Sequence, residues 1–104
     1  MDLVNQIKAK ANGIFIDLGF EEVIVDHYMA GEKETNYCLG NLYCCVDYVE
    51  SLGFIVQYAR SLYEAQCYAY GDGRRFPLRL GEAAILEGIK NELLEAIKDE
   101  KIAW

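Results

Sequence analysis

The sequence predicts an α+β fold: an antiparallel sheet of about four strands, with an N-terminal and a C-terminal helix packed on one face (α-β-β-β-β-α). Apolar residues recur at spacings of three and four near both ends of the chain, which is typical of amphipathic helices. Between these ends the apolar period changes to two, and β-branched and aromatic residues become frequent. Because 104 residues have room for one hydrophobic core, we expect a single domain over residues 1–104.

The first helix is predicted at about residues 2–18. Asp2 is placed to cap its N-terminus. Gly19 lies where a left-handed C-cap would, and we expect Phe20 to pack back on Phe15, as in a Schellman motif. The apolar stripe consists of Leu3, Ile7, Ala11, Ile14 and Leu18.

The central part of the chain is predicted to form the sheet. Strands are expected at Glu22–Met29, within Tyr37–Glu50, at Phe54–Arg60 and at Tyr63–Tyr70. The segments between them are a polar loop at Ala30–Asn36, a turn at Ser51–Gly53 and the strongest turn signal of the chain at Gly71–Gly73, followed by a short extended piece at Phe76–Leu80. Gly40-Asn41 is compatible with either a bulge in one long strand or a tight hairpin.

The last helix is predicted at about residues 81–100, with Gly88 allowing a close approach to the sheet. Its core-facing stripe consists of Ile85, Leu86, Ile89, Leu93, Ala96 and Ile97. Acidic residues lie early in this helix and lysines late, which matches the direction of the helix dipole.

Strand alternation assigns two faces to the sheet. Small and apolar side chains such as Cys44 and Val56 are expected under the helices, together with those of the strand at Tyr63–Tyr70 that share the face of Ala65. Since two helices cannot cover both faces, the other face is expected to be open. The side chains predicted there are Tyr43, Cys45, Asp47, Ile55, Gln57, Gln66, Tyr68 and Tyr70. A register slip of one residue would invert this assignment.

Charge is distributed unevenly along the chain. The formal net charge is −7, and residues 1–50 hold nine acidic residues against three lysines. Such a field repels phosphate backbones and attracts basic surfaces, although charge that only keeps a small protein soluble is an equally weighted alternative. We expect a cytoplasmic protein that binds neither nucleic acid nor a membrane, because neither a signal peptide nor an apolar span is recognisable.

Candidate catalytic and metal-binding groups are few. The four cysteines lack the C-x-x-C spacing of structural zinc sites, and adjacent Cys44 and Cys45 point to opposite faces of a strand. We therefore expect no metal and no cofactor. A small thiol- or metal-dependent enzyme that uses Cys38 or Cys45 with His27, the only histidine, remains a less favoured alternative.

The favoured function is that of a small non-enzymatic inhibitor that occludes a basic surface of a partner protein. In size, acidity and lack of a catalytic motif, the chain resembles the broad class of small bacterial and phage inhibitors, which includes toxin-immunity and anti-CRISPR-type anti-defence proteins. The acidic residues would steer association and the tyrosines would supply contact area. A structural or adaptor protein that forms a homodimer through the open sheet face is the alternative. The predicted partner-binding residues are Asp17, Glu21, Glu22, Asp26, Glu32, Glu34, Tyr43, Asp47, Tyr68 and Tyr70.

Overall fold

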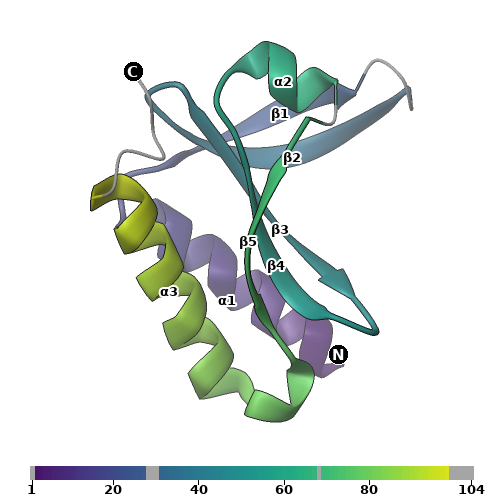
Figure 1. The fold of residues 1–104 in the computed structure, drawn as a ribbon, viewed down its shortest axis with the longest axis vertical. Coiled ribbons are helices and arrows are strands. Elements are labelled where there is room, and N and C mark those ends of the chain that lie inside the picture. Colours follow the sequence, from purple (N-terminus) through teal and green to yellow (C-terminus); the bar gives the residue numbers. More distant parts are fainter. Residues whose placement is uncertain (1, 28–30, 68, 99–104) are drawn as a thin grey trace.

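The fold is α+β, with an N-terminal helix, a five-stranded antiparallel sheet and a C-terminal helix (Figure 1). A computed structural model describes residues 2–27, 31–67 and 69–98. The strands follow one another through the sheet in the order β1-β2-β3-β4-β5. The elements are α1 (Leu3–Asp17), β1 (Glu21–His27), β2 (Glu32–Leu39), β3 (Leu42–Val49), β4 (Gly53–Ala59), α2 (Leu62–Gln66), β5 (Gly71–Phe76), the 3-10 turn η1 (Leu78–Leu80) and α3 (Glu82–Lys98).

Helix α1 begins and ends as its sequence predicts. The side chain of Asp2 accepts a hydrogen bond from the backbone N–H of Asn5 at 2.8 Å. At the other end Gly19 has a φ of 95°, and the N–H of Phe20 donates to the carbonyl of Phe15 at 3.0 Å. The two phenylalanine rings meet edge to face with centroids 5.4 Å apart. The predicted Schellman end is therefore confirmed, and it directs the chain into β1.

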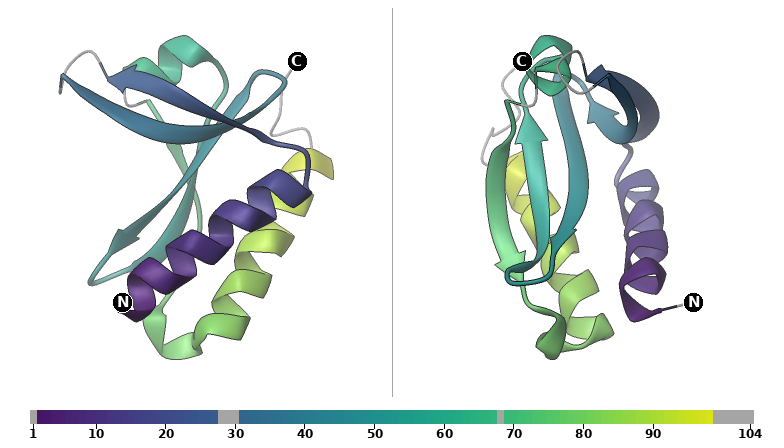
Figure 2. Two further views of the ribbon diagram at one scale, coloured as in Figure 1. Left: turned by 180° about the vertical axis from the view of Figure 1, so that it is seen from behind. Right: turned by 90° about the vertical axis from the view of Figure 1, so that its right-hand side faces the viewer.

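Helix α3 packs beside α1 on the same face of the sheet (Figure 2). Its residues Ile85, Ile89 and Leu93 are fully buried. A Cβ on Gly88 would lie 2.4 Å from Cε1 of Phe76, so this glycine permits the predicted close approach to the sheet. The last two predicted helical residues, 99 and 100, lie outside the described part of the chain.

Two tight connections shape the middle of the sheet. Strand β2 ends at Leu39 and β3 begins at Leu42, so Gly40-Asn41 is a hairpin turn and not a bulge. Gly40 adopts a φ of 60°, which glycine tolerates without a steric penalty. The turn predicted before β4 is confirmed, and Gly53, at a φ of 93°, pairs with Val49 there.

Three sequence predictions about this region are wrong. Strand β2 already begins at Glu32, inside the expected polar loop, because the facing strand β1 offers it a complete ladder. The expected strand at Tyr63–Tyr70 is the helix α2 instead, because Ser61 caps it by accepting a hydrogen bond from the N–H of Glu64 at 3.1 Å. The expected turn at Gly71–Gly73 forms the beginning of β5. Of the predicted first strand, residues 28 and 29 lie outside the described part.

One of the glycines that suggested this turn, Gly73, permits a close approach between β5 and α3. The register between β4 and β5 shifts between Ile55 and Gln57. A Cβ on Gly73 would lie 2.5 Å from Oε1 of the buried Glu92. The same oxygen accepts a hydrogen bond from the N–H of Arg74 at 3.3 Å. A carboxylate from α3 thus supports the irregular part of β5.

The sheet has the two faces that alternation predicts for β3 and β4. Leu42, Cys44, Phe54 and Val56 belong to the main core beneath α1 and α3. The opposite face is not fully open, because Ala65 of α2 packs there with Val25 and Ala59 in a second small core. The face that was expected to be open is therefore partly covered, and Ala65 does not lie under the two long helices.

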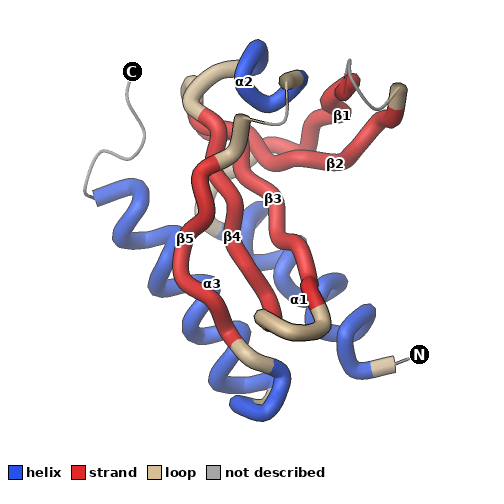
Figure 3. Tube along the Cα trace, turned by 45° about the vertical axis from the view of Figure 1, so that its right-hand side comes forward, coloured by secondary structure: helices blue, strands red, loops and turns tan. Residues whose placement is uncertain are grey.

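Strands β2 and β3 separate soon after their hairpin, which positions the site described below. Only three residues of each strand are paired, from Tyr37 with Cys44 to Leu39 with Leu42. Beyond that point β2 continues along β1, while β3 continues along β4. Figure 3 shows β1 and β2 crossing away from the other three strands. We call β1 and β2 together the β1–β2 arm.

Candidate protein-binding surface

The predicted acidic residues are placed on α1, on the β1–β2 arm and on β3. The exposed ones are Asp17, Glu21, Glu22, Asp26, Glu34 and Asp47. Glu32 begins β2, and its side chain lies outside the described part of the structure. Three of the exposed residues, Glu22, Glu34 and Asp47, line one cleft, whereas Asp17, Glu21 and Asp26 lie outside its lining.

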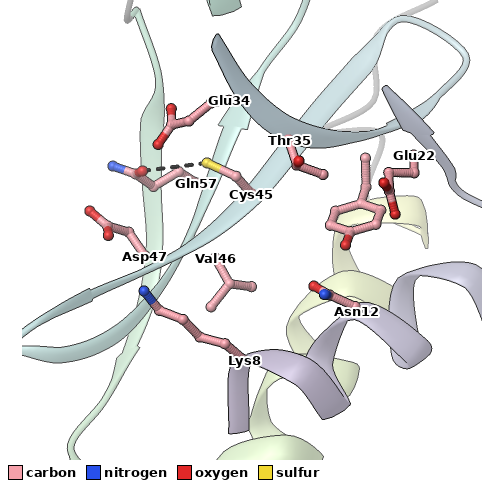
Figure 4. Close-up of a pocket in the computed structure, with 10 residues that line it drawn as sticks. Lys8, Asn12, Glu22, Glu34, Thr35, Cys45, Val46, Asp47 and Gln57 are labelled. Carbon is pink, nitrogen blue, oxygen red and sulfur yellow. Dashed lines mark hydrogen bonds between the residues drawn. The ribbon is translucent and has the colours of Figure 1, made fainter. Parts of the chain in front are cut away.

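The cleft lies where β2 and β3 separate, and it has a volume of about 290 Å³ (Figure 4). Helix α1 contributes the basic residue Lys8, whose side chain extends to the side of the cleft where Asp47 lies. One lysine and carboxylates from three different strands thus line the same cleft. The lining residues are Lys8, Asn12, Glu22, Glu34, Thr35, Tyr37, Cys45, Val46, Asp47 and Gln57.

Lysines do little to offset the acidity around the cleft. The Nζ atom of Lys10 lies 3.0 Å from Oε2 of Glu82, so this lysine is engaged with the start of α3. Lys33 on β2 is exposed and lies opposite Asp26 in the register of the arm. Lys8 is therefore the base that the described structure places in the cleft lining.

Cys45 lies in the cleft as an unreactive thiol. Its Sγ atom donates to Oε1 of Gln57 at 3.6 Å. Burial, assisted by the nearby carboxylates of Glu34 and Asp47, raises the pKa of Cys45 to about 12. Burial also raises the pKa of the neighbouring Cys44 thiol. Both thiols are protonated at neutral pH, and a thiol is a weak nucleophile compared with its thiolate.

His27 is paired with a carboxylate. Its ring is buried, and Nε2 lies 2.6 Å from Oε2 of Glu34. Cys38 lies opposite Glu21 at the other end of the arm, six residues from His27 along β1. At roughly 3.3 Å per strand residue this is about 20 Å, too far for a nucleophile and its base. Within the described residues, no group of three or more His, Cys, Asp and Glu side chains is arranged to hold a metal ion.

The tyrosines do not form the open strand face that the sequence predicts. Tyr43 lies on the expected face, but it packs against the second core, which α2 covers. Tyr70 precedes β5, and its hydroxyl donates to Oδ1 of the buried Asn36 at 2.9 Å. Tyr68 lies outside the described residues. Tyr63 on α2 is 70% exposed, although its predicted strand would have placed it under the helices.

The sequence predicted the three carboxylates of the cleft as binding residues. It gave no indication of their polar neighbours Lys8, Asn12 and Thr35, or that these side chains share a cleft. The missing information is the separation of β2 from β3, which alternation does not record because it assigns faces and not strand neighbours. The position of Tyr63 on a helix could have been predicted, since Ser61 and Glu64 match a capping box.

Neither the helices nor the comparisons with known proteins point to a particular function. Among the described residues, no helix has the length and apolar character needed to cross a membrane. Comparison of the chain with protein-family models, with curated proteins and with solved structures gave no match. The function proposed next therefore depends on the charge, the cleft and the chemistry of this surface.

Proposed function

We propose that this protein is a non-enzymatic inhibitor that binds a basic surface of a partner protein and occludes it. The surface to be occluded is one that binds nucleic acid, as on a nuclease. The protein would act on it in the manner of toxin-immunity or phage anti-defence proteins. The observation that carries the proposal is the set of exposed carboxylates on the β1–β2 arm and β3, with one lysine in the cleft between them.

Strand β1 concentrates negative charge on the arm. Glu21, Glu22 and Asp26 are exposed on one strand, and Lys33, opposite Asp26 on β2, is the base that the register of the arm places beside them. Such a surface steers a basic partner toward it and raises the rate of association. The same negative field repels the phosphates of a nucleic-acid backbone. A basic surface on the partner protein is therefore the preferred ligand.

The thiols and the histidine support a binding role over a catalytic one. Cys45 is protonated at neutral pH, and the buried ring of His27 contacts the exposed Glu34 through Nε2. A Cys–His enzyme needs a thiolate or a thiol within hydrogen-bond reach of its base. The register of the arm separates Cys38 from His27, so that pair finds no geometric support.

The test is capture of a partner from native lysate on the immobilised protein, at about 0.1 M and about 1 M NaCl. Raising the salt shortens the Debye length from about 10 Å to about 3 Å, so the partner should be retained at low salt only. The variant Glu21→Lys/Glu22→Lys should lose it. The control Glu87→Lys/Glu95→Lys changes the net charge equally on exposed positions of α3 and should retain it.

Inhibition is then measured directly on the captured partner. Adding the protein should release the partner from a labelled nucleic acid in a gel-shift assay, and the arm variant should not. Equal loss of capture in both variants would mean that only the total charge matters. Unchanged capture in both, or a captured partner without a basic surface, would contradict the proposal.

A further inference from the structure

The cleft between β2 and β3 exposes the edges of two strands. Glu32–Asn36 of β2 is paired with β1 alone, and Cys45–Val49 of β3 is paired with β4 alone. Within the described part of the chain, each stretch therefore has one side without a neighbouring strand, and the two open sides face the separation seen in Figure 3. A strand edge of this kind is a template for a further strand.

The direction of the main-chain groups on β3 follows from the pairing. Alternate residues of an antiparallel strand direct N–H and C=O to the same neighbour. The N–H of Tyr48 donates to Oδ1 of Asp47 at 2.9 Å, and Leu42 and Cys44, which share its parity, pair with β2. By alternation, Val46 directs its N–H and C=O to the same open side, and Val46 lines the cleft. The edge is thus available for pairing at Val46, where the cleft lies, while Asp47 occupies the N–H of Tyr48.

Charge and size indicate what would pair there. Glu22, Glu34 and Asp47 reach the cleft from β1, β2 and β3, against Lys8 from α1. Its volume of about 290 Å³ is close to the lower end of the range for small-ligand sites, about 300 Å³. That space suits one long side chain and is too small for a helix. Carboxylates from several directions favour the forked guanidinium of arginine or the ammonium of lysine.

We propose that this cleft receives an extended, basic segment of the partner protein, whose main chain adds to the open edge of β3 and whose arginine or lysine side chain binds between Glu22, Glu34 and Asp47. This deepens the proposed function and rests on it. Recognition by strand addition draws affinity from the main chain and specificity from alternate side-chain pockets. The rest of the acidic arm then steers the segment into place.

The probe is a synthetic peptide of about seven residues, alternating valine and threonine around one central arginine. Binding is followed by the amide chemical shifts of the isotope-labelled protein. Shifts are expected at Thr35, Val46 and Tyr48. Methylation of alternate peptide amides, or replacement of the arginine by citrulline, should weaken binding at least threefold.

Matched charge variants locate the side-chain site. Glu22→Gln/Asp47→Asn removes two charges from the cleft and keeps an acceptor oxygen for the N–H of Tyr48. It should weaken the peptide three- to tenfold, as expected for the loss of two exposed charge contacts. Glu21→Gln/Asp26→Asn removes two charges from exposed positions outside the cleft lining and should change the affinity less than twofold.

Each outcome decides one part of the proposal. Equal binding of the methylated peptide would overturn strand addition, and equal weakening by the two variants would overturn the cleft as the charge site. If free arginine shifts the same amides with the same affinity, the ligand is a small basic molecule and not a segment. Should the cleft variant bind the captured partner normally while Glu21→Lys/Glu22→Lys does not, this inference fails and the proposed function stands.

Discussion

The two helix glycines, Gly13 in α1 and Gly88 in α3, should respond in opposite ways to alanine. A Cβ on Gly13 meets no atom within 4 Å, so Gly13→Ala gains only helix propensity, about 1 kcal/mol. A Cβ on Gly88 would lie 2.4, 2.7 and 3.1 Å from Cε1, Cδ1 and Cζ of Phe76. Ordinary carbon contacts are about 3.5–4.0 Å, so the buried ring must move by roughly 1 Å. Overpacking of this kind costs about 1–3 kcal/mol.

The propensity gain is common to both substitutions and cancels in their difference. We therefore expect Gly88→Ala to be less stable than Gly13→Ala by about 1–3 kcal/mol in urea unfolding followed by circular dichroism. Gly13→Ala itself should raise the melting temperature by about 4 °C. In a double-mutant cycle, Phe76→Leu should cost less stability in the Gly88→Ala background than in the wild type. Equal stabilisation by the two alanines would refute the packing of α3 against β5.

Three further predictions test single contacts. Asp2→Ala should lower the free energy of unfolding by about 1 kcal/mol while Asp2→Asn should not, because asparagine also caps; thermal unfolding measures both. Tyr70→Phe should cost about 1–3 kcal/mol in urea unfolding, since it removes the donor to the buried Oδ1 of Asn36, and an unchanged stability would contradict that contact. Cys45 has a raised pKa in the fold, about 12 against about 9 unfolded, so its contribution to stability is constant below pH 9 and lost as the pH rises toward 12. The stability advantage of the wild type over Cys45→Ser should shrink by roughly 1 kcal/mol between pH 7.5 and pH 10, measured by urea unfolding at each pH, whereas a constant difference would mean that the thiol is not protected.

The sequence predicted most accurately those features that depend on contacts close in the chain. The cap at Asp2, the Schellman end at Gly19 and the faces of β3 and β4 each follow from neighbours within a few residues. The helix α2 was missed although its signal is also local. Alternation through Tyr63 and Ala65 imitates a strand, and only the Ser61 cap separates the two structures.

The cleft is different, because distant parts of the chain determine it. Phe15 of α1 stacks on Tyr37 with ring centroids 4.3 Å apart and holds the beginning of the arm to the main core. Farther along the arm, Val25 packs with Ala59 and Ala65 on the opposite face of the sheet. One strand pair is thus attached to two cores on opposite faces, and its pairing with β3 ends between them. No periodicity within β2 or β3 contains this information.

This origin of the cleft also bears on the homodimer alternative. An unpaired strand edge favours association between copies of a chain, and proteins limit it with charged side chains and local caps. Here Asp47 caps the N–H of Tyr48 on the open edge of β3, and Glu34 stands on the facing strand. A second copy would bring the same carboxylates to the same edge, where like charges oppose pairing. A basic segment would meet no such repulsion, so the acidic edge fits the proposed basic partner better than a second copy of the chain.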